Sequence, residues 1–254
     1  MTHTTTREAY DGHNLDPAEV AQFERQAALW WDARGPFRLL HRIGPLRLGY
    51  IRDVATKHFG LDPSTRWPFK GLTCLDVGCG GGLIAEPLAR LGGTVTGIDP
   101  APGNVETARA HASSTGLDID YRAAAAEELA ASGSGFDIVT CLEVVEHVPD
   151  PAAFVTTLGQ LVNPGGLLVL STLNRTAKSF ALAIVGAEYV LGWVPRGTHD
   201  WKRFITPTEL AGFCHAAGLG EFAEKGMIYN PLSDAWTLSG DASVNYLAHA
   251  IKPK

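Results

Sequence analysis

The feature that most constrains the fold is a glycine-rich stretch, "LDVGCGGG", at residues 75–82. It ends a short apolar run typical of a buried strand, and it begins a segment with helical periodicity. Glycines at such a turn let backbone N–H groups approach a ligand closely. Asp99 ends the next predicted strand, about 20 residues further on, where a carboxylate can bind ribose hydroxyls. These residues predict an α/β domain that binds a ribose-containing ligand beside its first strand.

Apolar strands alternate with helices along the middle of the chain. Alternation at this spacing predicts a parallel sheet that is covered by helices on both faces. The expected strands cover residues 72–78, 93–100, 117–124, 136–144 and 167–174, and two further strands are expected at 221–230 and 243–251. The expected fold class is therefore α/β, with a mostly parallel seven-stranded sheet.

The rest of the sequence is expected to complete one domain, residues 16–254. Residues 1–15 are polar, lack the apolar core of a signal peptide and are predicted to be a disordered lead. Asp16 and Pro17 mark the start of the first helix, whereas glycines and prolines delay the second helix to about residues 46–59. The domain is expected to comprise N-terminal helices (16–70), a cofactor-binding core (71–173), an apolar insertion after the fifth strand (174–204) and the C-terminal part of the sheet (205–254).

Charge and cysteine content narrow the class of protein. The net charge of −6 provides no overall positive field for nucleic acid. The four cysteines form no CxxC pair and no disulfide pattern, which favours a reducing cytoplasm. The longest apolar stretch, residues 180–194, contains Glu188 and two glycines and is shorter than the roughly 20 residues that span a bilayer.

The acids around the glycine-rich stretch discriminate between two ligands. Gly80, Gly82 and Ala85 fit the dinucleotide pattern, so spacing alone does not exclude NAD. Asp76 and Glu86 would repel a pyrophosphate at the helix N-terminus, whereas the sulfonium and ammonium of S-adenosylmethionine favour nearby carboxylates. We therefore expect S-adenosylmethionine, with Asp76, Gly80 and Asp99 among the residues that bind it.

Several longer stretches carry a more specific signal. "LDVGCGGG" is shared by many methyltransferases, but "GAEYVLGWVPRGTHDW" and "HRIGPLRLGYI" are similar to the ubiquinone-biosynthesis O-methyltransferases, which are Rossmann-like class I methyltransferases. The resemblance implies methyl transfer to catechol hydroxyls of polyprenylated precursors, 2-polyprenyl-6-hydroxyphenol and 3-demethylubiquinol. It also implies that Arg47, Gly78, Asp99 and Leu142 contact the cofactor. The segment "PAPGNVETA" departs from the family pattern, which leaves the adenine contact there open.

The stretch "CLEVVEHVPD" contains the candidate catalytic residues Glu143, Glu146 and His147. At relative positions i, i+3 and i+4 they would share one face of a helical turn. The resemblance implies that they bind a divalent cation, with Mg²⁺ suited to carboxylates and able to acidify a catechol. Two alternatives stay open: His147 as a general base without a metal, or residues that only shape the mouth of the pocket.

Residues 177–195 form a dense apolar cluster flanked by cations, among them Arg175 and Lys178. Such a segment suits an anionic membrane surface or a tunnel for a polyprenyl tail, and a lid packed on the core is the alternative. The expected location is cytoplasmic, peripheral to the inner face of the membrane, with other ubiquinone-biosynthesis enzymes as further partners. His199, Asp200 and Trp201 are expected at the edge of the pocket.

Three other functions compete with O-methylation. A carbon-methylating enzyme that acts on a related lipid quinone is the nearest alternative. A nicotinamide-dependent oxidoreductase would use the same sheet, but the acids of the glycine-rich stretch argue against it. A non-catalytic lipid- or cofactor-binding protein would have no need for Glu143, Glu146 and His147.

Overall fold

The computed structural model describes residues 13–182 and 200–254. Most of the predicted lead, residues 1–12, lies outside the described residues. So do residues 183–199, which include His199 and most of the expected membrane segment.

One sheet extends through the molecule, with the strand order β3-β2-β1-β4-β5-β8-β6-β7. The strands are β1 (Thr73–Val77), β2 (Thr94–Asp99), β3 (Asp120–Ala123), β4 (Phe136–Leu142), β5 (Val162–Leu173), β6 (Gly220–Asn230), β7 (Ala235–Ser239) and β8 (Asn245–Ile251). The first five strands pair in parallel, and β8, β6 and β7 pair antiparallel. The predicted α/β class is confirmed.

The predicted number of seven strands was wrong, because the described residues form eight. The additional strand is β7, which forms a hairpin with β6. Its residues are half-buried or exposed, so the strand has no buried residue that would indicate it.

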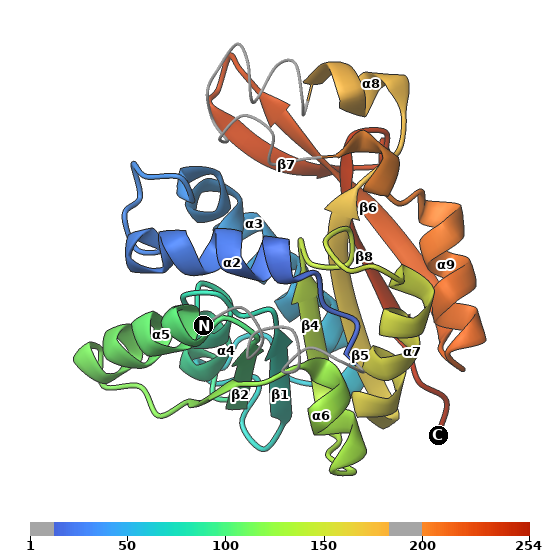
Figure 1. Ribbon diagram of the computed structural model, residues 1–254. Coiled ribbons are helices and arrows are strands. Elements are labelled where there is room, and N and C mark those ends of the chain that lie inside the picture. Colours follow the sequence, from blue (N-terminus) through green and yellow to red (C-terminus); the bar gives the residue numbers. More distant parts are fainter. Residues whose placement is uncertain (1–12, 183–199) are drawn as a thin grey trace.

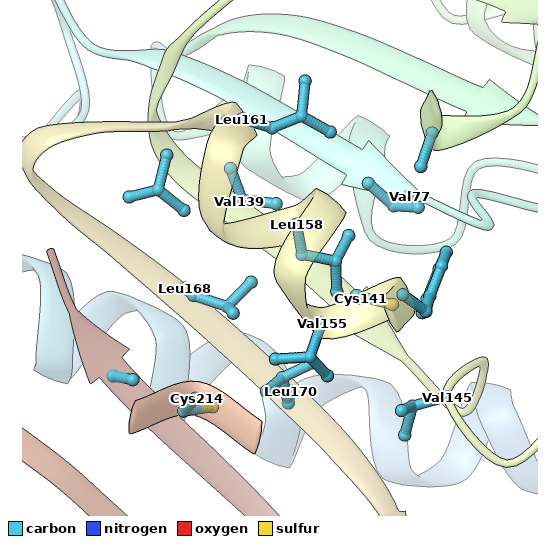
Figure 2. Packing of buried hydrophobic residues seen from close by; sticks show 14 of the residues in the cluster. Val77, Val139, Cys141, Val145, Val155, Leu158, Leu161, Leu168, Leu170 and Cys214 are labelled. Atoms are coloured by element: carbon cyan, nitrogen blue, oxygen red, sulfur yellow. The ribbon is translucent and has the colours of Figure 1, made fainter. Parts of the chain in front are cut away.

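Each face of the sheet buries its own apolar layer, and β5 shows why. Leu168 and Leu170 pack on one face with α7, whereas Leu167 and Val169 pack on the other with α3 and α4, as the two-residue period of a strand requires. Figure 2 shows the first layer, where side chains of α7 meet those of β4 and β5. A strand that is buried on both faces needs a continuous apolar sequence, which "LLVL" provides at residues 167–170.

Helices cover both faces of the sheet. Those of the described residues are α2 (Pro17–Gln26), α3 (Arg38–Phe59), α4 (Ala85–Arg90), α5 (Pro102–Ser114), α6 (Ala126–Ala131), α7 (Pro151–Leu161), α8 (Ala177–Ser179) and α9 (Pro207–Ala216), with short 3₁₀ turns η1 (Ala27–Leu29) and η3 (Trp201–Arg203). None of them is long and apolar enough to cross a membrane. Asp16 caps α2 by accepting a hydrogen bond from the N–H of Ala18, as expected.

Helix α3 begins eight residues earlier than residue 46 and continues through Pro45. Proline removes one helical hydrogen bond, but α3 buries Ile43, Tyr50 and Ile51 on both sides of that position. Tertiary packing of one face supplies most of the stability of such a helix, so the proline does not end it. Figure 1 shows α2 and α3 above the ends of β1 and β4 toward which the strand arrows point.

Candidate active site

A cavity of about 580 Å³ lies between the carboxyl ends of the central strands and the N-terminal helices. Gly78, Asp99 and Leu142 line it from the sheet, and Glu143, Glu146 and His147 line it from the loop after β4. Residues of α2, α3 and the β6–β7 hairpin form the opposite side, most of them apolar. The carboxyl ends of parallel strands are the usual ligand site of such a sheet.

Asp99 sits at the end of β2 and is held by three donors. Its Oδ2 accepts from the N–H of Gly80 at 2.9 Å, and its Oδ1 accepts from the N–H of Ala101 at 2.9 Å and from Asn104 Nδ2 at 3.1 Å. Burial raises its pKa, although these hydrogen bonds oppose the shift. The carboxylate is therefore fixed in position before any ligand arrives.

The glycine-rich loop needs its glycines for two reasons. Gly78 and Gly80 have positive φ angles, 68° and 52°, which side chains disfavour. A Cβ on Gly80 would also lie 2.3 Å from the Trp30 ring, and one on Gly78 would lie 2.4 Å from Val144. The loop is therefore packed tightly under the N-terminal helices, with Gly78 at the cavity wall.

Two acids that were used to predict the ligand do not line the cavity. Asp76 is buried in β1, where it accepts a hydrogen bond from Thr140 Oγ1 at 2.7 Å, and burial raises its pKa to about 7. The Glu86 carboxylate contacts His111 Nδ1 of α5 at 2.6 Å and Arg90 of its own helix, α4, at 3.4 Å. Neither acid is therefore placed to contact a cofactor bound in the cavity, and neither charge acts on such a ligand at short range.

Arg47 is buried, and its guanidinium lies 2.5 Å from Glu143 Oε1. The same oxygen accepts from Ser171 Oγ at 2.7 Å. Arg47 Nε has no hydrogen-bond partner among the described residues. Burial lowers the pKa of Arg47, and the charges of Glu143 and Glu146 oppose that shift. Arg47 therefore lies behind the cavity wall, with one donor free.

Glu146 differs from every other acid of the site. It is 3% exposed, and neither carboxylate oxygen has a hydrogen-bond partner among the described residues. Thr172 lies close enough to lower its pKa slightly, but the hydroxyl makes no hydrogen bond of acceptable geometry. Burial and the charge of Glu143 raise the pKa of Glu146 well above that of an ordinary glutamate.

His147 contacts the N-terminal helix. Its Nδ1 lies 3.1 Å from Glu19 Oε2, and its ring meets that of Phe23 edge-on at 5.5 Å. Burial alone would lower the pKa of His147, but the hydrogen bond to Glu19 and the charge of Glu146 raise it above 6.5. An imidazole of this kind can accept a proton near neutral pH.

The predicted helical face for Glu143, Glu146 and His147 was wrong. Glu143 has a left-handed φ of 56°, and residues 143–148 form a loop. Among the residues that the structure describes, no three His, Cys, Asp or Glu side chains are grouped so that they could hold a metal ion. All three residues line one wall of the cavity, but metal ligation by them stays a prediction.

The remaining predicted pocket residues lie elsewhere. Asp200 caps η3, and Trp201 Nε1 donates to the carbonyl of Thr176 at 2.9 Å. Neither residue lines the cavity. The apolar side chains of Leu182, Met227 and Trp236 line it instead, together with other residues of the β6–β7 hairpin.

Sequence reasoning missed the contacts made by the N-terminal helices. Trp30 Nε1 donates to Asn104 Oδ1 at 2.8 Å, and Asn104 in turn bonds Asp99. Trp31 Nε1 donates to the carbonyl of Gly81 at 2.9 Å. The two tryptophans are adjacent in the sequence, but nothing in their spacing indicates contact with residues 50 to 74 positions away.

Comparison with known proteins agrees with this geometry. Residues 51–220 match the family model "Methyltransferase domain". The chain is 54% identical to the "Ubiquinone biosynthesis O-methyltransferase" of Methylobacterium nodulans, over 95% of this chain and 97% of that protein. It is also 54% identical to the protein of the same name from Azorhizobium caulinodans, over 91% of this chain and 92% of that one.

Solved structures show the same fold. The magnesium protoporphyrin IX methyltransferase of Synechocystis, crystallised with bound SAH, aligns with a TM-score of 0.63 at 20% identity. The alignment covers 98% of this chain and 99% of that chain. A "possible histamine N-methyltransferase" from Thermotoga maritima also aligns with a TM-score of 0.63, at 17% identity, over 92% of this chain and 99% of that chain.

Proposed function

The chain belongs to the ubiquinone biosynthesis O-methyltransferases, and from this premise we propose how its cavity performs the reaction. It is an S-adenosylmethionine-dependent enzyme that methylates catechol hydroxyls of polyprenylated ubiquinone precursors. The acceptors we propose are 2-polyprenyl-6-hydroxyphenol and 3-demethylubiquinol. One observation carries the placement of the site: a single cavity is bounded by Asp99 on one side and by Glu143, Glu146 and His147 on another.

Asp99 and Gly78 form the cofactor end of the cavity. The fixed carboxylate of Asp99 suits two ribose hydroxyls, and Gly78 lets the backbone approach the ligand. Leu142 adds an apolar contact at the end of β4. We assign Arg47 to the cofactor carboxylate, because its buried guanidinium lies behind the cavity wall and its Nε donor has no partner among the described residues.

Methyl transfer is an in-line displacement, so the enzyme has to align the acceptor oxygen, the methyl carbon and the sulfur. The phenolic O–H must also lose its proton. His147 is the group we assign to that proton, because it lines the cavity and because its pKa is raised above 6.5. The oxygen–carbon bond forms as the carbon–sulfur bond breaks, and the proton passes to the imidazole.

The magnesium hypothesis has one observation for it and one against it. The unpaired oxygens of Glu146 are of the kind that a cation would satisfy. Glu143, however, is held by Arg47 and Ser171. As arranged, the three side chains do not form a ligand set, so no step of the proposed reaction is assigned to a metal. Full turnover after treatment with a chelator would exclude the metal hypothesis.

The apolar end of the cavity suits a polyprenyl tail. Leu182, Met227 and Ile228 line it, and Phe180 and Leu182 are about half exposed beside it. We propose peripheral contact with an anionic membrane through residues 177–195. Lys178 is paired with Asp241, which leaves apolar contact as the larger contribution from the described part of this segment. Flotation with liposomes tests this: Phe180→Asp should float less than wild type, and equal flotation contradicts the proposal.

The decisive experiment is incubation with labelled S-adenosylmethionine and a short-chain demethylubiquinol analogue, with and without Mg²⁺. Mass spectrometry should find a methoxy group, whereas a ring methyl would indicate carbon methylation. Calorimetric titration with S-adenosylhomocysteine and with NADH separates the methyltransferase from an oxidoreductase. Binding of NADH alone would overturn the proposal.

A further inference from the structure

An acid from the N-terminal helix reaches the loop after β4. Glu19 lies in the first turn of α2, 128 residues before His147, and its Oε2 lies 3.1 Å from His147 Nδ1. The side chains of Glu19 and His147 are 24% and 15% exposed. The contact is therefore largely shielded from water, which makes a charged hydrogen bond stronger than one on the surface.

We propose that Glu19 is a positioning residue for methyl transfer, which holds the His147 ring with Nδ1 toward α2 and leaves Nε2 to the cavity. This inference rests on the proposed function. It assigns a role to a residue outside the loop that contains the candidate catalytic group.

The chemical reason is the tautomer of the imidazole. A neutral histidine carries one N–H, and the nitrogen that carries it is set by the hydrogen bond made there. An ionised carboxylate only accepts, so Glu19 requires the hydrogen on Nδ1 and leaves a lone pair on Nε2. Nε2 is thereby ready to accept the phenolic proton as the methyl group leaves sulfur.

The carboxylate of Glu19 is held from a second direction. Arg203 lies 3.4 Å from Glu19 Oε1 and 3.1 Å from Asp16 Oδ2. One turn further along α2, Phe23 packs edge-on against the His147 ring, as the i, i+4 spacing of a helix allows. Glu19 and Phe23 of α2 therefore restrict the imidazole, and Arg203 of η3 restricts the carboxylate of Glu19.

The same contact is useful whichever role His147 has. A histidine that binds a metal through Nε2 usually donates its other N–H to a carboxylate, and loss of that partner costs about 10- to 100-fold in activity or affinity. The inference therefore does not depend on whether the reaction uses a metal.

The test compares Glu19→Leu, which removes the acceptor, with Glu19→Gln, which retains a neutral one. Glu24→Leu is the matched control, because Glu24 is an acid of the same helix that accepts from the N–H of Gly103 and not from His147. We expect Glu19→Leu to lower kcat by about 10- to 100-fold with the KM for S-adenosylmethionine unchanged. We expect Glu19→Gln to retain most of kcat, and Glu24→Leu to retain wild-type kcat.

A second measurement needs no acceptor and no turnover. The ¹⁵N spectrum of labelled histidine at about pH 9, where an ordinary imidazole is neutral, reports the tautomer, and a His147→Gln variant assigns the signal. We expect Nδ1–H for His147 in the wild type and loss of that preference in Glu19→Leu. If the wild type fails to methylate the acceptor, the proposed function fails while this spectrum still tests Glu19.

Four results would overturn the inference. The first is wild-type turnover by Glu19→Leu. The second is an equal loss of turnover in Glu24→Leu, which would indicate only a loosened helix. The third is a Glu19→Gln variant as slow as Glu19→Leu, which would assign the effect to charge and not to orientation. The fourth is an Nε2–H tautomer in the wild-type spectrum.

Discussion

Two acids that line the same cavity differ strongly in the hydrogen bonds that they receive. Asp99 receives three hydrogen bonds within 3.1 Å, whereas Glu146 is at least as deeply buried and receives none from the described residues. A satisfied carboxylate belongs to a site that is complete before its ligand binds, and an unsatisfied one costs folding free energy until a ligand compensates. The side that we propose for the cofactor is therefore preorganised, whereas the side that we propose for the acceptor is completed only on binding.

The strongest test of this difference is Asp99→Ala. It removes the proposed ribose ligand and leaves three donors unpaired, so we expect the Kd for S-adenosylhomocysteine to rise by at least about 100-fold, or about 2.7 kcal/mol. Calorimetry measures the change. Asp137→Ala is the control, because that carboxylate bonds Thr73 at the start of β1, whereas Asp99 lies at the carboxyl end of β2. A similar loss of affinity in both variants would assign the effect to general damage.

Gly80→Ala tests how tightly the preorganised side is packed. A Cβ there would lie 2.3 Å from Trp30 at a φ of 52°, so we expect the free energy of unfolding to fall by about 2 to 3 kcal/mol. Gly60→Ala has a similar φ of 64° with no atom within 4 Å of the added Cβ, and we expect about 1 kcal/mol from strain alone. Urea denaturation compares the two, and equal losses would contradict a packed loop.

Glu146→Gln examines the other side. In the wild type, the pKa of Glu146 is higher in the folded protein than the value of about 4.3 in the unfolded chain. The free energy of unfolding of the wild type therefore falls as the pH rises from about 4.3 through the native pKa, because the buried carboxyl group becomes charged. At pH 8 we expect the free energy of unfolding of the variant to exceed that of the wild type by about 1 to 2 kcal/mol. We also expect a lower rate of methyl transfer. The gain should disappear at about pH 4. A variant less stable than wild type at pH 8 would show that Glu146 is already paired.

The smallest expected effect comes from Trp30→Phe, which retains an aromatic side chain but removes the Nε1 donor to Asn104. We expect the Kd for S-adenosylhomocysteine to rise by about three- to tenfold, near 1 kcal/mol. No change in affinity would mean that Asn104 holds Asp99 without help from the N-terminal segment.

The sequence predicted the local geometry around Asp99 better than the local geometry around Glu143, and the reason is physical. The strand, the glycine-rich turn and Asp99 are linked by local spacing, because a parallel sheet brings the ends of consecutive strands together. The caps of α2 and α9 are local as well, and the capping box of Thr206 and Glu209 is present as its spacing indicates.

Contacts between distant segments could not be read from spacing. Glu19 and His147 meet only because α2 crosses the strand ends, and the left-handed conformation of Glu143 breaks the helical face that its spacing indicated. Strand β7 was missed for a related reason, because its half-exposed residues carry no buried pattern. Burial periodicity finds core elements, whereas a site assembled across the chain needs the tertiary fold.

The two adjacent indoles over the glycine-rich loop have a practical consequence. Trp30 stacks on Phe37 at 3.7 Å and lines the cavity, and Trp31 stacks on His111 at 3.4 Å. The molecule thus carries its own fluorophores within contact distance of the loop that we propose binds the methyl donor. Emission from these indoles should report arrival and departure of the donor in real time, so a stopped-flow experiment on the unlabelled enzyme can separate ligand exchange from chemistry.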